Sequence, residues 1–251
     1  MYLFDAGKLH RSFVAKCAAQ DDIVWLIWIM PTHRFIFFDV GNTLLFPNRA
    51  RLLAPLPREK HPTLEQWQAL ERRTKQEFDR GLMSGKIDHG FWWTFHTYLL
   101  RQCNALDDNT RNALIENTQQ SANWDQILPG TRDALDRIRR HYEVAVISNA
   151  DGKIDAVLSR CGICDCFASI TDSGNVGREK PHPEIFAAAL RAMKADPAES
   201  LYVGDVYSVD YVGARNAGMD AVLFDVAGAY RGREWPRIES LAELETWLQK
   251  Y

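Results

Sequence analysis

The chain has 251 residues, of which 46% are hydrophobic and 25% are charged, and its formal net charge is −3. This composition excludes a largely disordered chain and predicts one large globular domain, or one domain that carries an insertion. Because there is no basic excess, charge gives no reason to expect nucleic acid or an anionic membrane as a partner, and we expect a small molecule instead.

The first 30 residues contain one apolar run, 23–30, with the sequence IVWLIWIM. The run is far shorter than the ~20 residues that a membrane-spanning helix needs, so no membrane span is predicted. Asp21 and Asp22 directly precede it and no small-residue cleavage site follows, which disfavours a secretory signal. We expect residues 1–30 to be an N-terminal extension, and Met30 is a second candidate for the start of the protein.

Cysteine usage predicts a reducing, cytoplasmic setting. The chain has five cysteines, an odd number, and a chain of this length stabilises itself by burial without a disulfide framework. Cys161, Cys164 and Cys166 have a spacing that suits a thiolate-bound metal, but no fourth cysteine or histidine lies close by in sequence. We therefore expect small buried thiols in this cluster.

From residue 34 onward, short apolar segments rich in β-branched and aromatic residues alternate with amphipathic helical ones. The strand-like segments are 34–40, 142–148, 167–171, 200–206 and 220–226. Strands without polar alternation predict a parallel sheet that is buried on both faces. Pro183, Gly218 and the capping pair Ser240 and Glu243 mark helix ends between or after these strands. The pattern predicts an α/β protein with a doubly wound, Rossmann-like parallel sheet.

The interval 47–122 interrupts this alternation because it contains no strand-like run. Thr63 and Gln66 form a capping box that predicts a first helix, and further helices are expected from near Asp88 and from about Asp108. The interval is therefore predicted to be an inserted α-helical cap domain, and its many aromatic side chains are expected to form its own core. The α/β core would then consist of residues 31–46 and 123–251.

The predicted cap carries several basic residues. They include Arg49, Arg51, Arg72, Arg73, Lys75 and Lys86. Contact with a substrate anion is one interpretation for them. A solvated helix face is the expected role for most of them, because long charged side chains are seldom buried.

Polar residues gather at the carboxyl ends of the predicted strands, where doubly wound sheets bind their ligands. They are Asp39 at the first strand, Ser148 and Asn149 at the second, and Asp205 with Asp210 at the fourth, while Lys180 lies in the loop before the helix that leads to the fourth strand. Each residue alone has a structural explanation, such as a turn cap or a solvated side chain. Together, at successive strand ends, they predict one site.

Four segments in this order resemble the haloacid dehalogenase superfamily of hydrolases. They read FFDVGNTL, VISNADG, GREKPHPEIF and GDVYSVDYVGARNAG. The resemblance covers the chain from about Phe35 to Tyr251, and the helical insertion after the first segment is similar to the cap of the phosphatase branch. It implies a hydrolase of a small phosphorylated metabolite with Mg²⁺ as cofactor, and with neither nucleic acid nor membrane as partner. The oligomeric state and the substrate stay open.

The resemblance implies a nucleophile and a metal site. Asp39 would attack phosphorus and form an aspartyl phosphate, which divides a difficult hydrolysis into two steps. Mg²⁺ would bind the carboxylates of Asp39 and Asp205 and the backbone carbonyl of Gly41, and would reduce repulsion between the anions. Asp210 would hold a metal-bound water or support the other ligands.

The same resemblance implies the groups that bind the phosphoryl oxygens. Ser148 and Lys180 would contact these oxygens, and Lys180 would also offset the charge of the nucleophile. Backbone amides of the turn through Asn42 would complete the anion site, and Thr43 would hold that turn in place. Asn149, next to Ser148, is expected on the substrate-binding side.

Position 41 departs from the family pattern, because the phosphatases carry a second aspartate there that transfers protons. Gly41 retains a carbonyl for a metal but has no side chain to transfer a proton, and general acid–base catalysis is typically worth ~10²–10⁴ in rate. Three interpretations remain open. In the first, the protein is a phosphohydrolase in which another residue, such as Asp88 or His89, transfers the proton, or whose substrate has an acidic leaving group. In the second, it is a dehalogenase- or phosphonatase-type hydrolase. In the third, it is a catalytically weak protein that binds a phosphorylated ligand or a partner.

A nicotinamide-binding enzyme is disfavoured as a further alternative. No G-x-G-x-x-G turn follows the first predicted strand, and the carboxylate of Asp39 at its tip would repel a pyrophosphate group.

Overall fold

The computed structural model describes residues 33–86 and 89–249, and from His33 onward these form one compact unit. The apolar run 23–30, the alternative start Met30 and the candidate proton donor Asp88 lie outside the described residues. In the part of the chain that is described, no helix combines the length and the apolar character that crossing a membrane requires.

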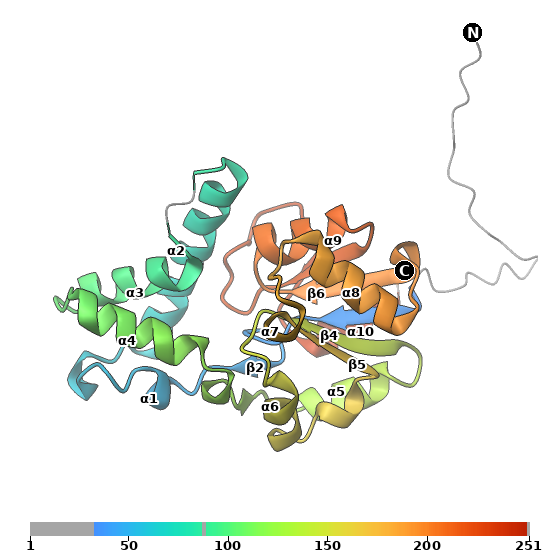
Figure 1. The fold of residues 1–251 in the computed structure, drawn as a ribbon, viewed down its shortest axis with the longest axis horizontal. Coiled ribbons are helices and arrows are strands. Elements are labelled where there is room, and N and C mark those ends of the chain that lie inside the picture. Colours follow the sequence, from blue (N-terminus) through green and yellow to red (C-terminus); the bar gives the residue numbers. More distant parts are fainter. Residues whose placement is uncertain (1–32, 87–88, 250–251) are drawn as a thin grey trace, which may run out of the picture. The chain divides into compact units, whose positions relative to one another are not determined.

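Six strands in the described residues form one sheet in the order β5-β4-β1-β6-β7-β8, and each neighbouring pair is parallel (Figure 1). The strands are β1 (Phe35–Phe38), β4 (Glu143–Ser148), β5 (Ser169–Asp172), β6 (Ser200–Gly204), β7 (Asp220–Phe224) and β8 (Arg237–Ile238). The prediction of a doubly wound parallel sheet is confirmed. The chain runs from β1 to β4 on one side and later to β6 on the other, so the carboxyl end of β1 lies at the topological switch point.

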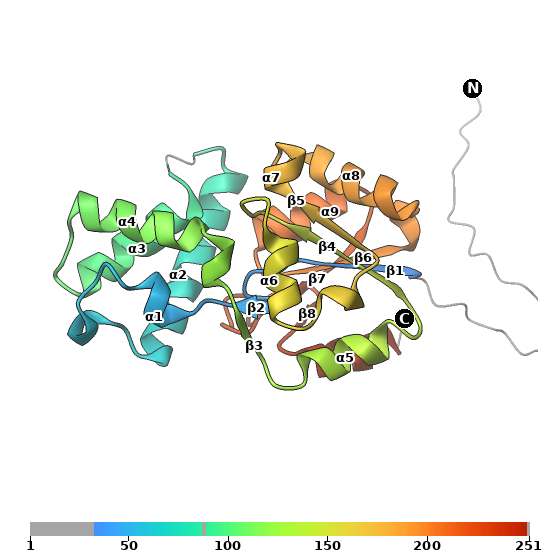
Figure 2. The ribbon, with the colours of Figure 1, turned by 60° about the horizontal axis from the view of Figure 1, so that its bottom comes forward.

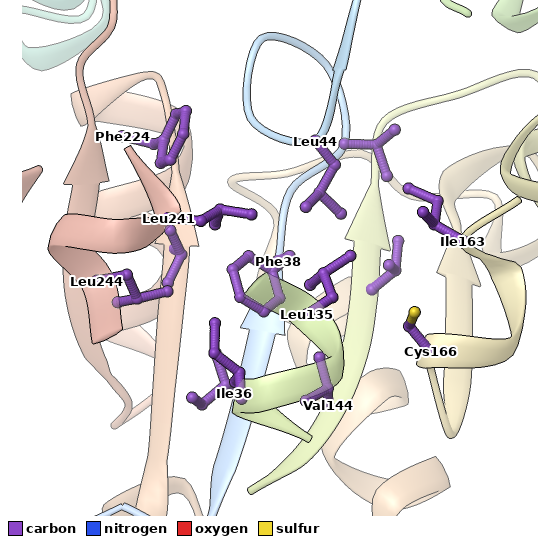
Figure 3. Close-up of a cluster of buried hydrophobic side chains, with 14 of the residues drawn as sticks. Ile36, Phe38, Leu44, Leu135, Val144, Ile163, Cys166, Phe224, Leu241 and Leu244 are labelled. Atoms are coloured by element: carbon purple, nitrogen blue, oxygen red, sulfur yellow. The ribbon is translucent and has the colours of Figure 1, made fainter. Parts of the chain in front are cut away.

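Side chains of β1 alternate between two apolar clusters, one on each face of the sheet. Ile36 and Phe38 belong to the first cluster (Figure 3), and Phe35 and Phe37 belong to the second. The helices α5 (Thr131–Ile138), α6 (Ile154–Arg160) and α10 (Leu241–Leu248) supply the first cluster, whereas α8 (Pro183–Met193) and α9 (Val212–Asn216) supply the second. This burial on both faces explains why the strands lack polar alternation.

A set of helices separates two short strands, β2 (Leu45–Phe46) and β3 (Gln126–Ile127), which pair antiparallel beside the main sheet (Figures 1 and 2). The helices are α1 (Arg49–Leu52), α2 (Leu64–Met83), α3 (Phe91–Gln102) and α4 (Asp108–Gln119). We call residues 49–119 the helical insertion. Its own apolar cluster includes Trp67 and Phe95, as predicted from its aromatic content. Thr63 caps α2 through both bonds of the predicted capping box.

Shorter helical elements complete the described fold. They are α7 (Ser173–Val176), the 3-10 turns Arg58–Lys60, Ser121–Asn123, Cys164–Cys166 and Pro197–Glu199, and a π-helical turn, Tyr207–Tyr211, which follows the loop after β6.

The expectation of a solvated face for the basic residues of the insertion holds for some of them and is wrong for Lys75. Arg51, Arg73 and Lys86 are exposed. Lys75 is only 1% exposed because it faces the α/β core, and its charge is compensated by Asp205 of the core and by Glu71 of α2. Arg72 also turns toward the core and donates a hydrogen bond to the carbonyl of Ala227 at 2.9 Å.

Candidate active site

The turn after β1 holds Asp39 at the carboxyl edge of the sheet. The backbone N–H of Asp39 donates to the carbonyl of Val203 on β6 at 2.8 Å, and Asp39 is 6% exposed. Asn42 has a φ of 54°, in the left-handed region that asparagine tolerates better than most residues, and its N–H donates to the carbonyl of Leu45 at 2.8 Å. Thr43 donates a long hydrogen bond of 3.5 Å to Asp39 Oδ2. The pairing with β6 thus fixes the backbone of Asp39, and the turn gives its carboxylate one hydrogen bond.

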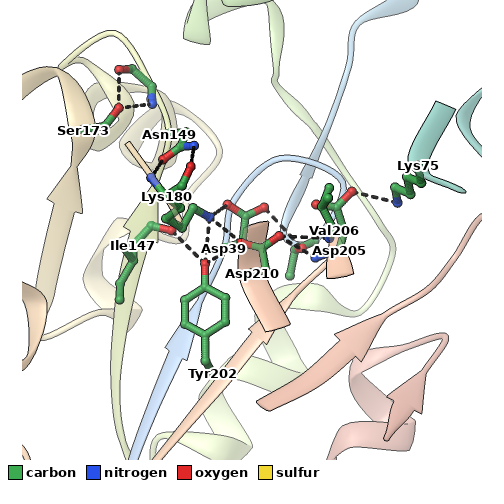
Figure 4. A network of polar contacts seen from close by, with 12 residues as sticks. Asp39, Lys75, Ile147, Asn149, Ser173, Lys180, Tyr202, Asp205, Val206 and Asp210 are labelled. Atoms are coloured by element: carbon green, nitrogen blue, oxygen red, sulfur yellow. Dashed lines mark hydrogen bonds and ion pairs between the residues drawn. The ribbon is translucent and has the colours of Figure 1, made fainter. Parts of the chain in front are cut away.

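Lys180 binds this carboxylate directly (Figure 4). Its Nζ donates to Asp39 Oδ1 at 2.6 Å, to Asp210 Oδ1 at 2.7 Å and to the Tyr202 hydroxyl at 2.7 Å. The side chain of Asn149 holds the backbone of Lys180, since its Oδ1 accepts from the Lys180 N–H at 2.7 Å and its Nδ2 donates to the Lys180 carbonyl at 3.1 Å. All three N–H bonds of the ammonium have partners, so the lysine is held in one orientation.

The loop after β6 brings two further carboxylates to the site. Asp210 Oδ2 accepts from the N–H groups of Asp205 at 3.2 Å and Val206 at 2.9 Å, which closes the loop. A Cβ on Gly204 would lie 2.6 Å from the Cβ of Asp210, so this closure requires a glycine. One oxygen each of Asp39, Asp205 and Asp210 lie within 4.8 Å of one another. The structure thus brings the sequence-predicted aspartates together.

A second buried lysine reaches the site from the helical insertion. Lys75 Nζ, on α2, lies 2.8 Å from Asp205 Oδ2 (Figure 4). It also lies 2.8 Å from Glu71 Oε1. Neither this contact nor that of Tyr202 was predicted. Tyr202 is an aromatic residue within an apolar strand, and Glu71 and Lys75 have the spacing of an ordinary helical ion pair, so neither carries a signal that local sequence could reveal.

The electrostatics of the site follow from burial. Burial raises the pKa of Asp39 to about 6, although the positive charge of Lys180 acts against it. Burial likewise raises the pKa of Asp205 to about 7, against the effect of Lys75. For Lys75 and Lys180, burial lowers the pKa, but the neighbouring carboxylates outweigh this effect and raise the pKa above its ordinary value. The ammonium groups therefore stay charged.

The donor set fits a hard divalent cation. Four carboxylates (Asp39, Glu71, Asp205 and Asp210) face two ammonium groups (Lys75 and Lys180), which leaves a net charge of −2 when all are ionised. One divalent cation would balance this charge. Carboxylate and backbone oxygens are the ligands that Mg²⁺ prefers.

Position 41 faces an aromatic side chain. A Cβ placed on Gly41 would lie 3.6 Å from the ring of Trp124, an ordinary van der Waals distance. Trp124 is buried, and its Nε1 donates to the carbonyl of Thr118 at 2.8 Å. The first carbon of a larger side chain therefore fits at position 41 without displacement of the backbone.

The other sequence-predicted residues lie in two places. Phe38 pairs with Val146, so Ser148, two residues further along β4 and 3% exposed, lies at the same edge of the sheet as Asp39. His89 stacks on Trp93 of α3 with 3.6 Å between ring centroids, and both line a pocket of about 270 Å³. The described residues that line this pocket all belong to the helical insertion.

Similarity to known proteins identifies the family of this chain. The family model of haloacid dehalogenase-like hydrolases matches residues 33–218. The chain belongs to this family. Human haloacid dehalogenase-like hydrolase domain-containing protein 3 is 30% identical over 210 residues, which cover 76% of this chain and 81% of that protein. The bovine protein of the same name is 32% identical over 167 residues, and the match covers 64% of this chain and 65% of the bovine protein, slightly under two thirds.

Two further similarities concern function and fold. Glyceraldehyde 3-phosphate phosphatase of Methanothermobacter thermautotrophicus is 40% identical over 94 residues, or 37% of this chain and 42% of that enzyme. Among solved structures, the HAD-hydrolase YfnB from Bacillus subtilis, bound to magnesium, superposes with a TM-score of 0.65 at 21% identity, covering 86% of this chain and 98% of that one. The predicted family and fold are thereby confirmed.

Proposed function

We propose that this hydrolase removes the phosphoryl group from a small phosphorylated metabolite, with Mg²⁺ as cofactor and an aspartyl phosphate as intermediate. The observation that carries the proposal is the cluster of Asp39, Asp205 and Asp210, of which Asp39 and Asp210 contact the ammonium of Lys180. The similarity to a glyceraldehyde 3-phosphate phosphatase over part of the chain supports a phosphate ester as substrate.

Asp39 and Lys180 carry the first chemical step in this proposal. The Asp39 carboxylate attacks phosphorus in line, and the bond to the leaving oxygen breaks. Lys180 stabilises the negative charge of the phosphoryl oxygens, and Ser148 donates a hydrogen bond to one of them. Asn149 acts as a positioning residue, because both polar groups of its side chain hold the backbone of Lys180.

Asp39, Asp205 and the carbonyl of Gly41 would hold Mg²⁺, which supplies charge neutralisation between nucleophile and phosphoryl group when it is bound. Asp210 supports this site through the N–H groups of Asp205 and Val206. The N–H of Asn42 donates to the carbonyl of Leu45, so it would join the anion site only if that bond opened, whereas the hydroxyl of Thr43 steadies the Asp39 carboxylate. Water then hydrolyses the aspartyl phosphate.

The helical insertion takes the role of a cap in this proposal, with residues 47–122 as the cap and residues 31–46 and 123–251 as the core. Since Gly41 cannot transfer a proton, the substrate would carry an acidic leaving group or receive its proton from another residue. Gly41 also favours a second candidate function, a protein that binds a phosphorylated ligand and turns it over slowly.

An aryl phosphate, whose leaving group is acidic, tests the proposal. We expect the wild type to hydrolyse it with Mg²⁺, Asp39→Asn to be inactive, and the exposed control Asp108→Asn to match the wild type. Gly41→Asp should increase the hydrolysis of an alkyl phosphate by ~10²–10⁴. If no variant releases phosphate from either ester although the wild type binds Mg²⁺, the second candidate function, binding of a phosphorylated ligand, is correct.

A further inference from the structure

Helix α2 contacts the core through polar side chains on one of its faces. Asp79 accepts hydrogen bonds from the backbone N–H of Ser208 at 2.9 Å and from the Tyr230 hydroxyl at 2.9 Å. Gln76 donates to the carbonyl of Ala229 at 2.9 Å. These contacts fix α2 against the loops that follow β6 and β7, and so determine where Lys75 lies.

Lys75 is held in place by charge. Its side chain is 1% exposed, and its ammonium lies 2.8 Å from both Glu71 and Asp205. A buried ammonium is stable only where carboxylates compensate it. In Figure 4 the carboxylates of Asp39, Asp205 and Asp210 lie between Lys180 on one side and Lys75 on the other.

The contact of Lys75 conflicts with the metal site of the proposed function. Asp205 is expected to bind the divalent cation through the same carboxylate that Lys75 contacts. Two cations on one carboxylate repel each other strongly where water is excluded. Lys180 likewise contacts a proposed ligand, Asp39, but Asn149 fixes its backbone in the core. Of the two contacts, that of Lys75 is therefore the one that can be released when the metal binds.

We propose that Lys75 is a positioning residue that competes with the divalent cation for Asp205. Docking of α2 therefore weakens metal binding, and metal binding loosens the docking of α2, since coupling between two binding events is reciprocal. The helical insertion thus senses whether the metal site is filled. This inference rests on the metal site of the proposed function.

Isothermal titration of the full chain with Mg²⁺ tests the competition. We expect Lys75→Met to bind Mg²⁺ about tenfold more tightly than the wild type. The Lys75→Met/Glu71→Gln double variant removes one cation and one anion together, so it leaves the net charge unchanged and leaves no unpaired Glu71. It should also bind more tightly. Arg80→Met removes an exposed cation from the same helix and should match the wild type.

Hydrogen exchange provides a second measurement, which compares the wild type with the double variant. Saturating Mg²⁺ should speed amide exchange in α2, and should leave it unchanged in the double variant. Slower or equal exchange in the wild type, or a double variant that binds Mg²⁺ no more tightly, overturns the competition. If the wild type binds no Mg²⁺, or if Asp205→Asn binds it equally well, the proposed metal site itself is wrong and the competition with it.

Discussion

The core loop before α8 and the insertion helix α2 each bring a buried lysine to the same group of carboxylates. Lys180 has its backbone fixed by both polar groups of Asn149, so it belongs to the rigid core. Lys75 is held by Glu71 one helical turn earlier and by Asp205 of the core, so its position depends on how α2 docks. Two lysines with similar burial and partners therefore differ in the structural element that fixes them.

The largest expected effect comes from the lysine of the core. Lys180→Met should lower kcat for an aryl phosphate by about 10³, because the phosphoryl oxygens lose their charged donor. Steady-state kinetics with Mg²⁺ measures this loss. The exposed control Lys194→Met should retain full activity. Equal rates for Lys180→Met and the wild type would contradict a role of Lys180 in catalysis.

Removal of the insertion lysine should affect stability more than catalysis. Lys75→Met leaves Glu71 and Asp205 buried without their cation, so the free energy of unfolding should fall by about 3–5 kcal/mol. Urea unfolding without metal measures the change. The Lys75→Met/Glu71→Gln double variant should recover part of the loss, because it leaves one carboxylate fewer unpaired. A double variant less stable than Lys75→Met would contradict this account.

Acid should distinguish the insertion from the core. Burial lowers the pKa of His96, in the insertion, to about 3. In the unfolded chain the pKa of this histidine is ~6.5, so between pH 6.5 and pH 3 the folded state binds fewer protons than the unfolded state. The contribution of His96 should therefore lower the free energy of unfolding by about 2 kcal/mol from pH 7 to pH 5. Asp39 of the core acts in the opposite sense. Burial raises its pKa to about 6, so protonation at lower pH removes a buried charge and increases the free energy of unfolding.

Urea unfolding of the wild type and of His96→Gln at pH 7 and pH 5 measures the contribution of His96. Glutamine does not titrate, and it can still hydrogen-bond Thr118, whose hydroxyl lies 2.8 Å from His96 Nε2. The variant should lose about 2 kcal/mol less than the wild type over this interval. An equal loss in both proteins would mean that His96 is protonated in the folded state.

The last expected effect concerns the docking of α2. Tyr230→Phe removes the hydroxyl that donates to Asp79 at 2.9 Å and accepts from the Tyr207 N–H at 2.9 Å. The free energy of unfolding should fall by about 1–3 kcal/mol, since buried partners lose a hydrogen bond. Thermal or urea unfolding measures this change, with Tyr142→Phe as a partly exposed control. A Tyr230→Phe protein as stable as the wild type would show that this contact does not hold the helix.

The parallel strands and the main site residues were predictable because their signals are local. Apolar runs without polar alternation indicated the parallel strands, and parallel strands place their carboxyl ends at one edge. Asp39, Ser148 and Asp205 follow such strands and meet at that edge. The two-residue strand β8 was missed, because so short a segment has no periodicity.

Sequence alone thus determined the family, the doubly wound sheet and the aspartates at its edge, and it identified Gly41 as the departure from the family pattern. Tertiary structure alone decided that Lys75 is buried, that Tyr202 binds Lys180, and that Trp124 covers position 41. The physical reason is that the charge and spacing of a helix such as α2 are the same whether it faces water or carboxylates. Only the docked partner determines which of its charges are desolvated.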